Sequence, residues 1–191
     1  MRTIMISILT GLLMAGCAAS TAVKEGSAIS DQPDWVQSMG YYDKGVGAIG
    51  SSAKSNLGSQ VQREDAMLSA RNELAKNIES RVQSAISQTR QRLIEQGIAG
   101  AEELGSLQTQ NAARQVVKMR LKNSRPVKQW KDPESGELYV WVVIEQRDLV
   151  AMQADVNGKV VGKTLKDASN AQHDQKIKDA FNEEFEEQFK N

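Results

Sequence analysis

The chain has 191 residues, with 24 basic and 24 acidic side chains and a formal net charge of zero. Balanced charge, 40% hydrophobic residues and three prolines are typical of a folded globular chain, and they exclude a disordered chain or one made largely of membrane spans. The basic residues alternate with acidic ones instead of forming a stripe, so we expect no nucleic-acid binding. A single cysteine and a single histidine provide neither a disulfide nor a zinc-ligand pattern, and we expect no metal and no cofactor.

The first residues have the pattern of a secretion signal. Arg2 gives a positive start, and residues 4–14 form a mainly apolar stretch. Spanning a bilayer needs roughly 18 or more apolar residues. The stretch therefore predicts a signal peptide, residues 1–16, that is removed and not kept as a membrane helix.

Small residues and a cysteine close this signal: Met14, Ala15, Gly16 and Cys17. The run resembles the lipobox of bacterial lipoproteins, which implies that Cys17 carries a diacylglycerol and further acyl chains such as palmitate, and becomes the first residue of the mature chain. Two or three acyl chains anchor a protein firmly, at about 0.8 kcal/mol per buried methylene. The alternative is an ordinary secretory signal followed by an incidental cysteine. Residues 17–32 are predicted to form a lipidated flexible tether.

The folded region is expected to begin near Pro33 and Trp35, and residues 45–50, Gly-Val-Gly-Ala-Ile-Gly, are its first predicted strand. The glycine spacing also matches the dinucleotide-binding fingerprint. That motif needs a helix that opens on its last glycine and an acidic residue about twenty positions on, at the end of a second strand. Here residues 51–58 are loop-like and a helix follows. The pattern therefore favours a tight strand packed under a helix over a nucleotide site.

Residues 59–96 contain no proline or glycine and have apolar residues every three or four positions, which predicts a long amphipathic helix. The residues expected to point inward are Met67, Ala70, Leu74, Ile78, Val82, Ala85, Thr89 and Leu93. The polar face is either solvated or a coiled-coil partner surface, and it carries Arg71, Lys76, Glu79, Arg90 and Glu95. A second, weaker helix is expected at residues 101–121, paired with the first, with inward Leu104, Leu107, Ala113, Val117 and Leu121.

A hairpin pattern follows, with residues 127–130 and 138–144 on either side of a turn sequence, Asp-Pro-Glu-Ser-Gly, at 132–136. In the second strand one face has Leu138, Val140, Val142 and Ile144, and the other has Tyr139, Trp141 and Val143. Because both faces are apolar, we expect a central strand that a helix covers on one side. Its other side is either partly covered or exposed to a partner.

A short closing helix is expected at residues 147–152, and the polar, glycine-containing residues 155–174 predict a loose linker. An acidic helix is expected at the C-terminus, with an aromatic stripe of residues four apart: Ile177, Phe181, Phe185 and Phe189. This stripe either docks on the chain's own domain or inserts into a groove on a partner.

Three stretches together resemble the LPP-twenty lipoprotein family. They are the segment from Trp35 to the Gly-Val-Gly of 45–47, the helix with Ala66, Ala70-Arg71 and Glu73-Leu74-Ala75, and the strand Leu-Tyr-Val-Trp-Val of 138–142. The resemblance covers roughly residues 33–150 and implies an α+β fold with a small antiparallel sheet against a long helix. The elements above agree: about three strands, a long amphipathic helix, a second helix and a C-terminal helix. We expect one domain at residues 33–154, then a polar linker and an amphipathic helix at residues 155–191.

The family resemblance implies a small envelope lipoprotein, since the family includes outer-membrane antigens and relatives of lipoproteins needed for flagella and motility. It has no catalytic residues to transfer. We expect no enzyme, because Cys17 is used for lipidation and the lone His173 lies in a polar tail. Ala18 after the cysteine favours, by resemblance to lipoprotein sorting, the outer membrane over the inner one. We expect the chain on the periplasmic face of that membrane.

The leading hypothesis is a lipid-anchored outer-membrane protein that acts as a structural or protein-interaction module, with a protein partner or self-association, in an envelope or flagellum-associated structure. The alternative is a periplasmic module that binds a peptide or glycan through the aromatic sheet face. The possible interaction residues are Trp130, Tyr139, Trp141, Phe181, Phe185 and Phe189.

Overall fold

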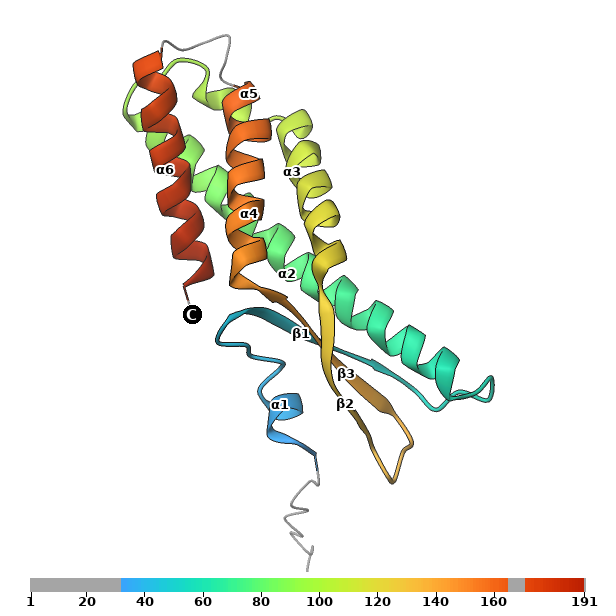
Figure 1. Cartoon of the computed structure of the whole chain (residues 1–191). Helices are drawn as coiled ribbons and strands as arrows, with labels where there is room; N and C mark the ends of the chain where they lie inside the picture. Colours follow the sequence, from blue (N-terminus) through green and yellow to red (C-terminus); the bar gives the residue numbers. More distant parts are fainter. Residues whose placement is uncertain (1–31, 165–170, 191) are drawn as a thin grey trace, which may run out of the picture. The chain divides into compact units, whose positions relative to one another are not determined.

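The protein has an α+β fold, as the sequence predicts. A computed structural model describes residues 32–164 and 171–190, which belong to one compact unit that starts at Gln32. A three-stranded antiparallel sheet with strand order β1-β3-β2 lies against the long helix α2 (Figure 1). The predicted signal peptide and tether lie outside the described residues.

The elements follow one another along the chain with short connections. The strands are β1 (Gly45–Ser52), β2 (Arg125–Lys131) and β3 (Leu138–Glu145). The α-helices are α1 (Asp34–Gln37), α2 (Ser59–Glu95), α3 (Leu107–Arg120), α4 (Gln146–Val156), α5 (Gly162–Thr164) and α6 (Ala171–Phe189). Two 3₁₀ turns, η1 (Ala101–Gly105) and η2 (Leu121–Asn123), and a π-helical stretch, η3 (Asn157–Val161), complete the fold.

Strand β3 is the central strand, which confirms the prediction from its two apolar faces. It pairs with β1 on one side and with β2 on the other, so that Trp141 lies opposite Ile49 and Lys128. Its residues on the α2 side are all buried: Leu138, Val140, Val142 and Ile144. The sheet therefore places one face of β3 in the core and leaves the other for the N-terminal segment.

The glycine-rich strand β1 packs directly under α2. A Cβ added to Gly50 would lie 2.0 Å from the amide nitrogen of Ala70 and 2.5 Å from the carbonyl oxygen of Ala66. Only a residue without a side chain permits this approach of helix backbone to strand backbone. The interpretation as a strand packed under a helix is confirmed.

Helix α2 is as long as predicted and ends in a Schellman motif. Gly97 has a left-handed φ of 69°. Its amide donates to the carbonyl of Ile94 at 3.0 Å, and the next amide, of Ile98, donates to the carbonyl of Leu93 at 2.9 Å. These two bonds satisfy carbonyls that a helix end leaves without partners. The predicted inward stripe is buried except for Met67, which is partly buried against the core.

The second helix is shorter than predicted. Residues 101–105 form the separate turn η1, and α3 starts only after Ser106, whose hydroxyl accepts from the Thr109 amide at 3.2 Å as an N-cap. Leu107 is therefore the first residue of α3 and is 75% exposed. Its predicted inward position is wrong, because the Ser106 cap fixes Leu107 as the first helical residue and so sets the rotation that leaves its side chain in solvent.

The prediction of a loose linker after residue 154 is wrong for residues 155–164. Helix α4 continues through η3 into α5, and Val156, Val160 and Val161 are buried. The Asn157 amide group donates to the carbonyl of Lys178 at 3.1 Å and to Oδ1 of Asn182 at 2.8 Å. Because buried valines and an asparagine paired with α6 recur along it, a stretch that is polar on average forms a packed helix.

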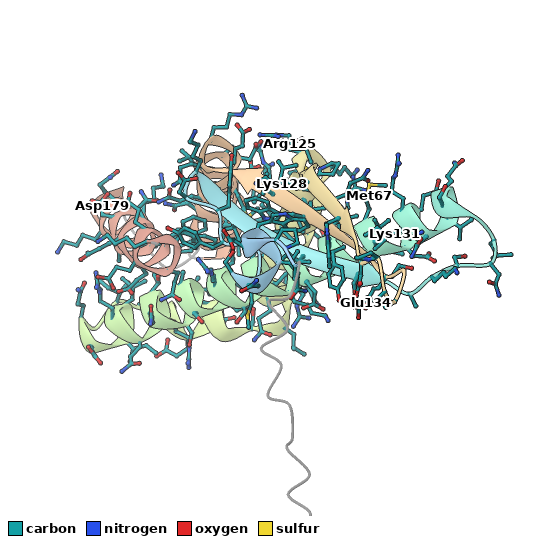
Figure 2. All side chains as sticks on the ribbon, turned by 90° about the horizontal axis from the view of Figure 1, so that it is seen from below. Met67, Arg125, Lys128, Lys131, Glu134 and Asp179 are labelled. Carbon is teal, nitrogen blue, oxygen red and sulfur yellow. The ribbon has the colours of Figure 1, made fainter. Side chains whose placement is uncertain are left out.

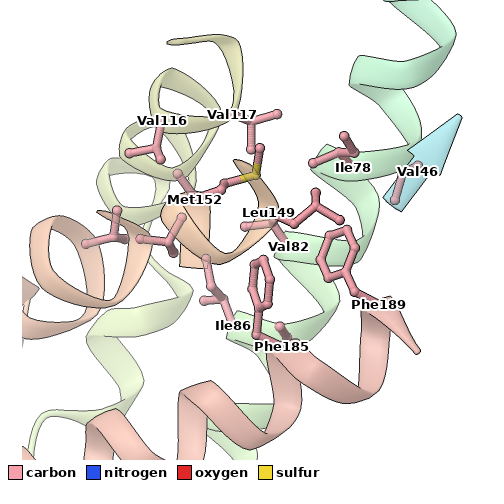
Figure 3. Close-up of a cluster of buried hydrophobic side chains, with 14 of the residues drawn as sticks. Val46, Ile78, Val82, Ile86, Val116, Val117, Leu149, Met152, Phe185 and Phe189 are labelled. Atoms are coloured by element: carbon pink, nitrogen blue, oxygen red, sulfur yellow. The ribbon is translucent and has the colours of Figure 1, made fainter. Parts of the chain in front are cut away.

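The aromatic stripe of α6 lies in the core. Phe181, Phe185 and Phe189 are 0%, 2% and 7% exposed, and the rings of Phe185 and Phe189 stack with centroids 4.5 Å apart. They meet Leu149 of α4 and Val82 of α2 in one cluster (Figure 3). Of the two interpretations of the stripe, docking on the chain's own domain is confirmed.

Candidate interaction surfaces

The predicted lipidation site lies outside the described residues. Cys17 and the preceding Met14, Ala15 and Gly16 fall in residues 1–31, so lipidation stays a prediction from sequence. Of the other predicted interaction residues, the three phenylalanines of α6 are buried and are not available to a partner. The remaining three, all on the sheet, separate into two groups.

The outer face of the sheet, on the side away from α2, is covered at its centre by residues 32–44. Trp35 stacks on Trp141 with ring centroids 6.0 Å apart and planes 10° apart, and Tyr42 meets the same indole in a T-shaped contact at 6.0 Å. The indole Nε1 of Trp141 donates to the carbonyl oxygen of Gly40 at 2.9 Å. Trp141 is thus a docking point for the chain's own N-terminal segment and not an open ligand surface.

Gly47 allows this segment to approach the sheet. A Cβ on Gly47 would lie 2.2 Å from the carbonyl oxygen of Gly40 and 2.5 Å from Nε1 of Trp141. Sequence reasoning found Trp35 and Trp141 but did not pair them. The available signal was that an aromatic residue before the first strand needs an apolar surface, and the second face of β3 is the apolar surface left uncovered.

Trp130 and Tyr139 form the second group, at the β2 side of the same face. Their ring centroids are 5.6 Å apart with a tilt of 38°, and both side chains are half-buried. The Tyr139 hydroxyl donates to Oε2 of Glu137 at 3.1 Å. Partial burial, and then this neighbouring carboxylate, raises the pKa of Tyr139. This pair is the open part of the predicted aromatic face.

Positive charge is concentrated in the stretch from α3 to the end of β2, where the basic residues do not alternate with acidic ones. Between Arg114 and Lys131 the sequence has seven basic residues and no acidic one. Figure 2 shows Arg125, Lys128 and Lys131 along this strand. Arg125 pairs with Glu145 at 2.8 Å, and that bond, followed by the charge of Arg147, lowers the pKa of Glu145.

Two open grooves flank the sheet. The first has a volume of about 400 Å³, lies between α2 and β2, and is lined chiefly by Met67, Pro126, Val127 and Val140, with Arg63 and Lys128 at its sides. The second has a volume of about 690 Å³ and follows strand β1 between residues 32–39 and α2. Sequence reasoning found neither groove, because each is lined by segments far apart in the chain.

The ionisable groups with shifted pKa values have local causes. The amide of Glu134 and the hydroxyl of Ser135 in the hairpin turn lower the pKa of Asp132. Near the end of α4, the hydrogen bond from Lys159 of η3, and then that from Arg120 of α3, lower the pKa of Asp155. Among the described residues, no three His, Cys, Asp or Glu side chains lie close enough to hold a metal ion.

The chain was compared with known proteins. No model of a known protein family matches it, and no curated protein sequence matches it. The resemblance to the LPP-twenty lipoproteins therefore rests on the short stretches given above.

Proposed function

We propose that the protein is a lipid-anchored lipoprotein of the outer membrane that presents a non-catalytic interaction domain to the periplasm. The observation that carries this proposal is the run Met14 to Cys17 after an apolar stretch too short to span a bilayer. In the described part of the chain no helix is long and apolar enough to cross a membrane. Acyl chains on Cys17 would supply membrane affinity of about 0.8 kcal/mol per buried methylene.

The envelope role follows the resemblance to LPP-twenty lipoproteins, and it includes association with a protein partner or with further copies, in an envelope or flagellum-associated structure. Two features of the described domain support an interaction role. Its two grooves and the half-buried Trp130–Tyr139 pair are formed by well-packed elements. Solvent-exposed apolar side chains, Met39 at 85% and Leu57 at 81%, add surface for contacts.

The anchor is tested with Cys17→Ala and a matched control, Ser20→Ala, in the predicted tether. We expect the wild-type chain and the control in the outer-membrane fraction after a high-salt wash, and the cysteine variant soluble in the periplasm or unprocessed. Mass spectrometry of the N-terminal peptide is expected to show an acylated cysteine. A free thiol, or membrane retention of the cysteine variant, would refute the proposal.

A second candidate function is binding of a peptide or glycan at the Trp130–Tyr139 pair. Two neighbouring aromatic rings that stay half-exposed favour it, since such rings serve as contact surfaces at many interfaces. Quenching of tryptophan fluorescence in a titration with envelope glycan fragments tests this candidate. Saturable quenching that Trp130→Ala removes supports it, and quenching that survives this change contradicts it.

A further inference from the structure

The two edges of the sheet differ in a way that points to a binding site. Strand β2 has the features that protect a sheet edge from pairing with another chain: Pro126, a register shift between Pro126 and Lys128, and lysines at 128 and 131. Strand β1, Gly-Val-Gly-Ala-Ile-Gly-Ser-Ser, has no charged residue and no proline. Its edge is therefore the one that the sequence leaves open to strand pairing.

The hydrogen-bond pattern shows which groups of β1 face outward. The carbonyl of Lys44 accepts from the amide of Gln146 at 2.8 Å. In an antiparallel ladder alternate residues bond to the partner strand, so Val46 and Ala48, in phase with Lys44, bond to β3. The backbone amides and carbonyls of Gly47 and Ile49 point to the free edge, and they have no hydrogen-bond partner among the described residues.

The groove of about 690 Å³ lies along this edge. Gly47, Ala48 and Ile49 line it. Since glycine has no side chain, Gly47 can contribute only backbone to the lining. The groove thus leads solvent to the unpaired backbone groups, and an added strand would lie about 4.8 Å from β1.

The two walls of the groove define the chemistry of an occupant. On the outer side Val36, Met39 and Tyr139 form an apolar wall. On the α2 side the wall is polar but neutral, because Lys76 and Glu73 pair at 2.6 Å. The exposed pair has no net charge and so gives no net attraction to a charged occupant, whereas an uncharged strand matches this wall and leaves the Lys76–Glu73 pair intact.

We propose that the free edge of β1 binds an extended, uncharged segment of a partner protein, whose residues alternate between apolar and small polar side chains. Its backbone pairs with Gly47 and Ile49, its apolar side chains face Val36 and Met39, and its polar side chains face Lys76. This proposal rests on the proposed interaction function, for which it names the site and the class of partner. It corresponds to strand addition, in which main-chain bonds give affinity and alternate side-chain contacts give specificity.

The experiment uses the isotope-labelled full chain in detergent micelles and a capped peptide that alternates threonine and valine. A control peptide with the same side chains has alternate backbone amides N-methylated. In the free protein we expect the amides of Gly47 and Ile49 to exchange with solvent faster than those of Val46 and Ala48. Saturating peptide should slow the exchange of Gly47 and Ile49, and the N-methylated peptide should bind about tenfold more weakly, the scale of losing backbone hydrogen bonds.

Two variants separate the site from the stability of the fold. Ile49→Pro removes an edge amide that does not bond to β3, a position at which an edge strand tolerates proline. Met39→Asp introduces a residue type that tolerates the left-handed φ of 54° better than methionine, and it puts a charge in the apolar wall. Both should reduce peptide binding about tenfold or more, whereas Leu107→Asp, at a residue 75% exposed outside the groove, should bind like the wild type.

Three results would overturn the proposal. One is equal protection of Gly47 and Ala48 amides in the free monomer, because the edge would then be covered. Another is peptide binding that both groove variants leave unchanged. The third is a dimer, detected by light scattering and removed by Ile49→Pro, which would give the edge to a second copy. None of these measurements depends on where the protein lies in the cell. The proposal of a lipid anchor is therefore tested separately, by the fractionation of Cys17→Ala.

Discussion

Replacing Gly50 by alanine tests the packing of β1 under α2. The added methyl group would meet the amide nitrogen of Ala70 at 2.0 Å, the carbonyl oxygen of Ala66 at 2.5 Å and the Cα of Ala70 at 2.6 Å. All three contacts are backbone atoms of a helix, which cannot turn aside as a flexible side chain would. The helix and the strand must therefore move apart.

The cost follows from the size of that movement. Carbon atoms pack at about 3.5–4.0 Å, so the contacts require a separation greater by 1 Å or more along a helix whose other residues are buried against the same sheet. Overpacking of a core costs about 1–3 kcal/mol and sometimes more. Because backbone on both sides is involved, we expect about 3 kcal/mol for Gly50→Ala, which corresponds to a fall in Tm of about 6–12 °C for a domain of this size.

Urea unfolding followed by circular dichroism measures this cost. Gly158→Ala is the matched control, since an added Cβ there meets no atom within 4 Å and its φ is not positive; we expect a change between zero and about 1 kcal/mol of added stability. If Gly50→Ala unfolds within about 0.5 kcal/mol of the wild type, the usual range of a surface change, then the close approach of helix and strand is refuted.

Three further changes test other contacts. Phe185→Ala should destabilise the protein by about 3–5 kcal/mol, as removal of a buried phenyl ring does; an unchanged melting temperature would mean that α6 does not dock on α2. Met39→Gly should raise the free energy of unfolding by up to about 1 kcal/mol, because the exposed methionine holds a left-handed φ of 54° that costs about 1–2 kcal/mol; calorimetry showing a loss would contradict that strain. Lys159 and then Arg120 lower the pKa of Asp155, so its stabilising contribution is present above the unfolded pKa of about 3.9 and is lost as the pH falls through the folded value. Asp155→Asn should therefore flatten the acid side of the stability profile in urea titrations, and an acid side as steep as in the wild type would disprove this assignment.

Periodicity located the elements well because local sequence and burial agree in them. The long helix, the hairpin and the central position of β3 follow from apolar spacing that the tertiary structure then uses. The predictions were wrong where they used the average composition of a segment and not the positions of its individual residues. Residues 155–164 are polar on average, but Val156, Val160 and Val161 are buried, and the packing of this segment against α3 and α6 stabilises it as a helix. In the same way a single capping residue, Ser106, moved the start of α3 and left Leu107 in solvent.

The candidate surfaces depended on the tertiary structure to a greater degree. The aromatic residues of β3 looked equivalent in the sequence, but Trp141 is covered by Trp35 and Tyr42, whereas Tyr139 keeps a half-open position beside Trp130. No spacing rule predicts which face the N-terminal segment covers, because that contact joins residues about a hundred positions apart.

The sequence by itself determined the α+β class, the helix periods, the hairpin and the prediction of a lipidated cysteine, since each depends on residues close together in the chain. Only the tertiary structure decided that the phenylalanines of α6 belong to the core, that Gly50 is a contact point for a helix, and that β1 has an open edge beside a groove. These properties depend on which distant surfaces exclude water from one another, and that is a matter of packing between elements and not of pattern within them.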